Sequence, residues 1–136
     1  MARRRTIDEL LEVARGRIER LTPEAASAAI EGGDVLIDIR CQETRQQTGT
    51  VPASVHIPLS VLYWRVGRAG DDVDPRISDP ASRLVLMCAH GYSSSLAAAT
   101  LRDLGFDGAT DVIGGFEGWQ AAGLPVERLV QPAAPR

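Results

Sequence analysis

The chain has 136 residues, of which 44% are hydrophobic and 24% charged, and these values fit one globular domain. The net charge of −3 argues against a general nucleic-acid binder, and no stretch approaches the ~18 consecutive apolar residues that predict a membrane-spanning helix. All 15 basic residues are arginines, and the absence of lysine excludes Schiff-base chemistry and a P-loop lysine.

Residues 1–21 are interpreted as an N-terminal helical extension that packs on the domain. Thr6 and Glu9 form a candidate capping box, and apolar residues follow at helical spacing from Ile7 to Leu21. A cluster of three arginines falls toward the predicted C-terminal end of this helix, where positive charge complements the helix dipole: Arg15, Arg17 and Arg20. The extension has no apolar signal-peptide core, so the cytoplasm is the expected location.

Short apolar runs alternate with helical segments through the rest of the chain. We expect buried strands at residues 35–38, 54–57 and 84–87, a short strand at 109–113, helices at 23–31, 94–104 and 116–122, and a helical turn at 59–66. Alternation of this kind predicts an α/β fold with a mainly parallel sheet, flanked by helices on both faces. The domain is assigned to residues 22–130, and residues 131–136 are expected to be a frayed tail.

Two predicted strands end at charged or reactive residues. One ends at Asp38, just before Arg40 and Cys41, and the other ends at Cys88. Ligands of parallel sheets bind beyond the carboxyl ends of the strands, so this edge is the expected site. Cys41 and Cys88 do not form a disulfide framework, and their spacing from the two histidines does not resemble a zinc site. We therefore expect no metal and no organic cofactor.

Cys88 lies between an apolar run and a predicted helix. Backbone N–H groups converge at a helix N-terminus, and such a position lowers the pKa of a thiol and binds anions. Gly91 permits a tight turn, and the following serines provide hydroxyl donors and a helix cap. The alternative interpretation is an inert cysteine buried in the core.

The segment Cys88-Ala89-His90-Gly91-Tyr92-Ser93-Ser94 resembles the active-site loop of rhodanese-like sulfurtransferases. Three further segments resemble family motifs in the right order: residues 35–40 with their Asp-x-Arg ending, residues 49–58, and residues 114–126. The resemblance covers roughly residues 22 to 127, and the chain is similar to single-domain members from high-GC bacteria.

This resemblance implies a rhodanese-like fold and a persulfide carried on Cys88. The sulfur comes from a donor such as thiosulfate or a persulfide and passes to a thiol, to cyanide or to a protein acceptor. Besides the catalytic Cys88, it implies the substrate-binding residues Ala89, His90, Gly91, Tyr92, Ser93, Ser94 and Arg40. Two further residues are expected to support the site, Asp38 as a positioning carboxylate and Arg65 as a source of charge.

The chain departs from the family pattern at Ser93, where the family has a basic residue. An arginine would clamp an oxyanion with two hydrogen bonds, so its loss predicts weak activity toward thiosulfate. The main alternative is therefore a binding or redox-sensing module with little turnover. A cysteine phosphatase is disfavoured, because such enzymes have an arginine where Ser94 stands. Cys41 is either a bystander thiol or a partner that resolves the persulfide.

Overall fold

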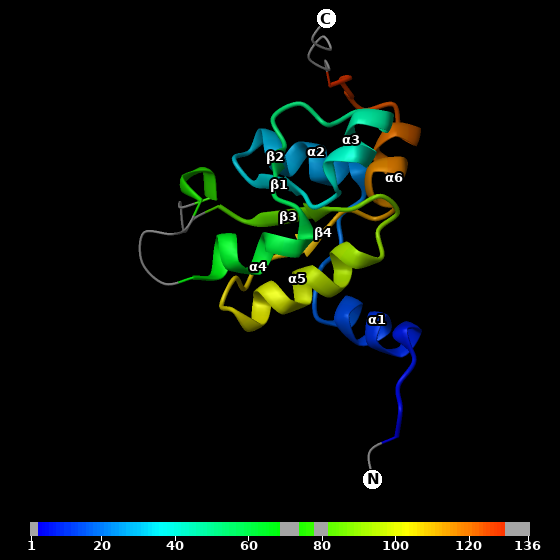
Figure 1. The fold of residues 1–136 in the computed structure, drawn as a ribbon, viewed down its shortest axis with the longest axis vertical. Helices are drawn as coiled ribbons and strands as arrows, with labels where there is room; N and C mark the ends of the chain where they lie inside the picture. Colours follow the sequence, from blue (N-terminus) through cyan, green and yellow to red (C-terminus); the bar gives the residue numbers. More distant parts are fainter. Residues whose placement is uncertain (1–2, 69–73, 78–81, 130–136) are drawn as a thin grey trace, which may run out of the picture.

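The computed structural model describes residues 3–68, 74–77 and 82–129, and helices and strands alternate along them (Figure 1). The helices are α1 (Ile7–Gly16), α2 (Pro23–Glu31), α3 (Gln42–Thr48), α4 (Leu59–Gly67), α5 (Ser93–Asp103) and α6 (Gly115–Ala121), with a 3₁₀ helix at Pro75–Ile77. The strands are β1 (Val35–Asp38), β2 (Val55–His56), β3 (Leu84–Met87) and β4 (Thr110–Asp111). The expected tail at 131–136 lies outside the described residues.

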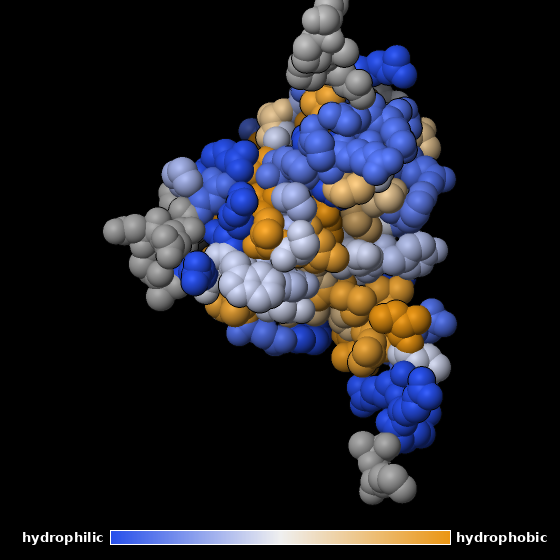
Figure 2. Space-filling view, viewed as in Figure 1, coloured by the Kyte–Doolittle hydropathy of each residue, from blue (hydrophilic) through white to orange (hydrophobic). Residues whose placement is uncertain are grey.

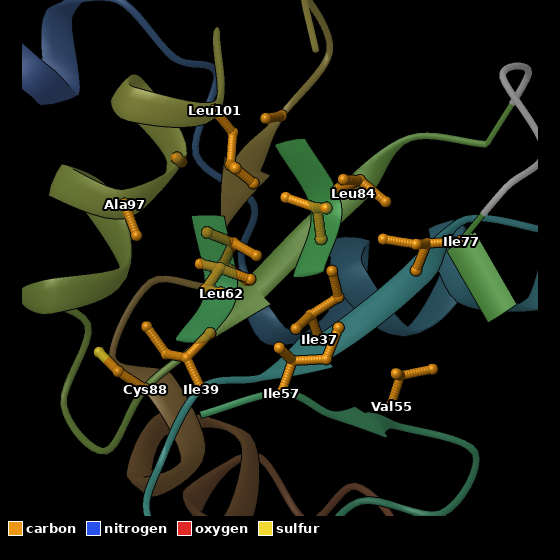
Figure 3. Packing of buried hydrophobic residues seen from close by; sticks show 14 of the residues in the cluster. Ile37, Ile39, Val55, Ile57, Leu62, Ile77, Leu84, Cys88, Ala97 and Leu101 are labelled. Carbon is orange, nitrogen blue, oxygen red and sulfur yellow. The ribbon is translucent and has the colours of Figure 1, made fainter. Parts of the chain in front are cut away.

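The four strands form one parallel sheet in the order β2-β1-β3-β4. In β1 and β3 the paired positions run from Val35 opposite Leu84 to Asp38 opposite Met87. Both strands therefore end at the same edge of the sheet, and the amide of Ile39 continues the ladder to the Met87 carbonyl at 2.9 Å. Figure 3 shows Cys88 next to Ile39, at the border of the core.

Helices cover both faces of the sheet, which confirms the predicted fold class. Alternate strand residues point to opposite faces, as the period of a strand requires. On one face Ile37, Leu84 and Cys88 share a core cluster with residues of α4 and α5 (Figure 3). On the other face Leu36 and Val85 belong to a second cluster, which includes residues of α2 and α6. Each face of the sheet is thus covered by its own hydrophobic cluster.

The first helix is shorter than its apolar spacing predicts. Thr6 caps it by accepting a hydrogen bond from the Glu9 amide at 3.1 Å, as expected, but the helix ends at Gly16. Leu21 instead forms a parallel bridge with Val112, at the edge of the sheet beside β4. The prediction of a helix reaching Leu21 was wrong, because backbone pairing with the sheet edge replaces helical hydrogen bonds there.

Helix α1 packs along α5 and leaves part of its apolar side in contact with solvent. Ile7, Leu10 and Val13 are exposed, and Figure 2 shows the apolar surface over this helix. Within the described residues, no helix has both the length and the apolar character that crossing a bilayer requires.

Two predicted strands are shorter than expected, and one helix was not predicted. The predicted strands at 54–57 and 109–113 are reduced to the two-residue strands β2 and β4. Helix α3 was not predicted, because its sequence QETRQQT has no apolar periodicity. Its position between β1 and β2 places it next to the edge of the sheet where the strands end.

Candidate active site

Cys88 follows β3 directly and begins a tight loop, residues 88–94, that leads into α5; we call it the cysteine loop. Gly91 has a φ of 87°, a backbone conformation that disfavours other residues. A Cβ at Gly91 would lie 2.8 Å from the Gly114 backbone nitrogen. The glycine is therefore needed both for the turn and for the close approach of a second backbone segment.

The Cys88 side chain is 8% exposed, and its sulfur contacts polar groups although it belongs to the core. The Gly91 amide donates a hydrogen bond to Sγ at 3.1 Å. On another side, Sγ lies 3.3 Å from the Ser94 hydroxyl oxygen, to which the thiol donates. Among the described residues, Gly91 is the one whose amide donates a hydrogen bond to Sγ. Of the converging backbone N–H groups expected around this thiol, the structure thus shows one bound to the resting sulfur, that of Gly91.

The carbonyl groups of Cys88, Ala89 and Gly91 are bound by groups outside the cysteine loop. At the start of α6, the amide of Phe116 donates to the Cys88 carbonyl at 2.8 Å, and the amide of Glu117 donates to the Ala89 carbonyl at 3.1 Å. The Gly91 carbonyl accepts from two arginines, at 2.8 Å from Arg15 and at 3.0 Å from Arg20. These bonds fix the peptide planes of the loop, which holds the Gly91 amide on the sulfur.

A buried carboxylate at the end of β4 completes the network around the sulfur. Asp111 is fully buried and accepts from the hydroxyls of Ser94 and Ser95, each at 2.7 Å. Arg20 forms a two-point ion pair with it, at 2.9 and 3.2 Å. An ionised carboxylate only accepts, so the Ser94 hydrogen points to Asp111 and its lone pairs face the Cys88 thiol.

Sequence reasoning missed Asp111, Arg15 and Arg20 as site residues. One signal for Asp111 was available: a carboxylate inside a predicted strand of a sheet covered by helices on both faces needs a cationic partner. The two arginines were assigned to the dipole of the first helix. Their contacts with the cysteine loop follow from the packing of α1 on α5, which the sequence does not specify.

Asp38 and Arg40 form a second buried network beside the loop. The guanidinium of Arg40 donates to both oxygens of Asp38 at 3.0 and 2.9 Å, and Arg45 adds a bond at 3.1 Å. Arg40 also binds the Gly49 carbonyl at 2.9 Å and lies 4.0 Å from the ring centroid of Phe116. Asp38 is therefore paired with arginine, and the pair links β1 to the start of α6.

The family model of the Rhodanese-like domain matches residues 22–122. The chain belongs to this family. Thiosulfate sulfurtransferase GlpE of Pseudomonas savastanoi pv. phaseolicola is 39% identical over 103 residues, covering 76% of this chain and 88% of that protein. These findings confirm the resemblance to this family, which the cysteine loop and three other segments had indicated, and place the protein among rhodanese-like sulfurtransferases.

Solved structures agree with the rhodanese-like fold. A protein of unknown function from Rhodopseudomonas palustris, described as a possible tyrosine phosphatase, has a TM-score of 0.83 and 30% identity. The match covers 93% of this chain and 98% of that protein. The polysulfide-sulfur transferase homodimer of Wolinella succinogenes has a TM-score of 0.72 and 23% identity, and the match covers 90% of this chain and 87% of that chain. At this identity the likeness supports the fold and says nothing about activity.

The predicted residues Arg40 and Arg65 lie at different cavities. Arg40, Ala89 and His90 line one cavity of about 240 Å³, and the other lining residues are Thr44, Thr48, Phe116, Glu117 and Gln120. His90 Nδ1 lies 2.7 Å from the Glu117 carboxylate, and both side chains are exposed. Arg65 lines a different cavity, with Val61, Trp64 and Arg68. The structure thus brings Arg40, but not Arg65, to a cavity that the cysteine loop lines.

Tyr92 and Ser93 are exposed at the start of α5, and Arg15 lies 5.7 Å from the ring centroid of Tyr92. Cys41 is an exposed free thiol at the start of α3, with its sulfur 3.1 Å from the Thr44 hydroxyl. Hydrogen bonds from the side chain and then the backbone of Thr44 hold the pKa of Cys41 below its usual value. Among the described residues, no group of three or more potential metal ligands is assembled.

Proposed function

We propose that the protein is a sulfurtransferase that moves sulfane sulfur from thiosulfate or a persulfide to a thiophilic acceptor through a persulfide on Cys88. The observation that carries the proposal is the hydrogen bond from the Gly91 amide to Sγ, in a loop whose peptide planes are held from outside. Such an arrangement stabilises negative charge on sulfur without any movement of the backbone. Names of relatives such as the GlpE protein support the same reaction class.

The reaction is a two-step covalent transfer. The Cys88 thiolate attacks the outer sulfur of thiosulfate, a new S–S bond forms, and the old S–S bond breaks with its electron pair leaving on sulfite. The persulfide on Cys88 then carries the negative charge on its outer sulfur. Cyanide or a thiolate attacks that sulfur, and the electron pair of the broken bond returns to Cys88 as thiolate.

Ser94 and Asp111 form a hydrogen-bond chain that can adapt when Cys88 changes from thiol to thiolate. In the resting state the thiol donates to Ser94, which donates to Asp111. When Cys88 is the thiolate, its proton having passed to water, the Ser94 hydroxyl turns its hydrogen from Asp111 to the sulfur. Asp111 tolerates this loss because Arg20 and Ser95 still donate to it.

Donor preference follows from the charge at the loop. Ser93 is exposed and uncharged where family members have a basic residue, so thiosulfate lacks the bidentate clamp that its oxygens prefer. We expect weaker activity toward thiosulfate than toward donors of lower charge, such as a persulfide. A thiol acceptor, free or on a protein, suits the reducing cytoplasm, where both cysteines stay free.

Initial-rate kinetics distinguish this proposal from the alternative, a rhodanese-like module that binds or senses redox state with little turnover. With thiosulfate and cyanide both varied, double-reciprocal plots should give parallel lines, because sulfite leaves before cyanide reacts. Intersecting lines would contradict a covalent intermediate. Absence of turnover with thiosulfate and with a persulfide donor would favour the module.

A further inference from the structure

Two arginines from the segment before the rhodanese-matched region converge on the cysteine loop. Arg15, in α1, donates to the Gly91 carbonyl at 2.8 Å, and Arg20 donates to the same oxygen at 3.0 Å. We propose that Arg15 is a positioning residue that locks Gly91 and supplies the positive charge that the loop lacks at Ser93. The inference rests on the proposed function and assigns this task to the N-terminal extension.

Charge balance singles out Arg15. Arg20 is neutralised by its two-point ion pair with the buried carboxylate of Asp111. Arg15 is half-buried, and none of the ion pairs seen among the described residues includes it. The Gly91 carbonyl therefore accepts from two guanidinium groups, and Asp111 balances the charge of only one of them, that of Arg20. The net positive charge at Gly91 comes from Arg15.

Packing makes the contact with Gly91 a rigid one. Arg15 also donates to the Ser95 hydroxyl at 3.2 Å, which ties α1 to the first turn of α5. A Cβ on Gly91 would lie 3.1 Å from the Arg20 guanidinium, so this residue is enclosed between Arg20 and Gly114. With its carbonyl held by two guanidinium groups, Gly91 keeps its amide directed at Sγ.

Alkylation of the two cysteines measures the charge at Cys88 without any need for turnover. The rate with iodoacetate, an anion, is divided by the rate with neutral iodoacetamide, separately for the Cys88 and Cys41 peptides by mass spectrometry. In Arg15→Gln we expect this ratio at Cys88 to fall about five-fold, since one partly buried positive charge is lost. Arg15→Lys, which keeps the charge, should retain the ratio, and the ratio at Cys41 should not change.

Arg17→Gln is the matched control, because Arg17 follows α1 directly but binds exposed Asp103 instead of the loop. It should leave the Cys88 ratio at the wild-type value. An unchanged ratio in Arg15→Gln, or an equal fall in Arg17→Gln, would overturn the inference while leaving the sulfurtransferase proposal intact. A wild-type Cys88 that neither reagent modifies, while Cys41 reacts, would overturn the proposed function and the inference with it.

Donor selectivity gives a second readout, which a merely structural role would not move. Thiosulfate is a dianion, whereas benzenethiosulfonate is a monoanion with the same kind of transferable outer sulfur. Arg15→Gln should lower kcat/KM for thiosulfate about five-fold more than for benzenethiosulfonate, and Arg15→Lys should restore the ratio. Equal losses with both donors would mean that Arg15 only stabilises the fold and supplies no charge to the site.

Discussion

Replacing Cys88 with serine is expected to lower sulfur transfer at least about a thousand-fold, because a hydroxyl does not form the persulfide on which both steps depend. The serine hydroxyl accepts from the Gly91 amide and donates to Ser94 as the thiol does, so the fold should be retained. Thiocyanate formed from thiosulfate and cyanide is the measurement, with circular dichroism as the check on folding.

The control for this variant is Cys41→Ser, which removes the exposed thiol and leaves the buried one. Because the pKa of Cys41 is lowered by Thr44, this thiol is itself a candidate nucleophile and needs to be tested. Cys41→Ser should keep the wild-type rate. Loss of transfer in Cys41→Ser with retention in Cys88→Ser would contradict the assignment, as would aryl phosphate hydrolysis that depends on Cys88 without any sulfur transfer.

Gly115→Ala is expected to destabilise the protein by about 2–4 kcal/mol and to reduce sulfur transfer at least about ten-fold. The new Cβ would lie 2.4 Å from the Cys88 carbonyl oxygen and 2.8 Å from the Gly91 nitrogen. These are backbone atoms of the cysteine loop, which cannot give way without moving the amide that binds Sγ. Urea unfolding and thiocyanate formation measure the two effects.

Gly123→Ala separates backbone strain from crowding. Gly123 also has a positive φ, 76°, but a Cβ added there would meet nothing within 4 Å. This variant should therefore lose only about 1 kcal/mol and keep its activity. If Gly115→Ala lost no more activity than Gly123→Ala, contact between α6 and the cysteine loop would not control the chemistry.

Buried strands and the cysteine loop were predictable because their sequence signals are local. The runs at 35–38 and 84–87 are apolar up to the points where Asp38 and Cys88 stand, and the structure confirms both strands. Gly91 likewise predicts a turn from its residue type alone. These features need no knowledge of which segments pack together.

The surroundings of the sulfur were not predictable, because they depend on packing between distant segments. Arg15 and Arg20 reach Gly91 only because α1 lies along α5, and Asp111 reaches Ser94 only because β4 lies beside β3. The sequence instead suggested Arg65 as a source of charge and Arg40 as a substrate-binding residue. Arg40 is bound by Asp38, and Arg65 lines a separate cavity.

The most direct test of the account follows the outer sulfur of thiosulfate onto the protein. Thiosulfate labelled at its outer sulfur is incubated with the protein, and the peptides that contain Cys88 and Cys41 are weighed by mass spectrometry. We predict that the Cys88 peptide gains one labelled sulfur, that unlabelled sulfite is released in equal amount, and that cyanide removes the label as thiocyanate. Label on Cys41 instead, or a Cys88 peptide of unchanged mass after treatment with thiosulfate and with a persulfide donor, would contradict the account.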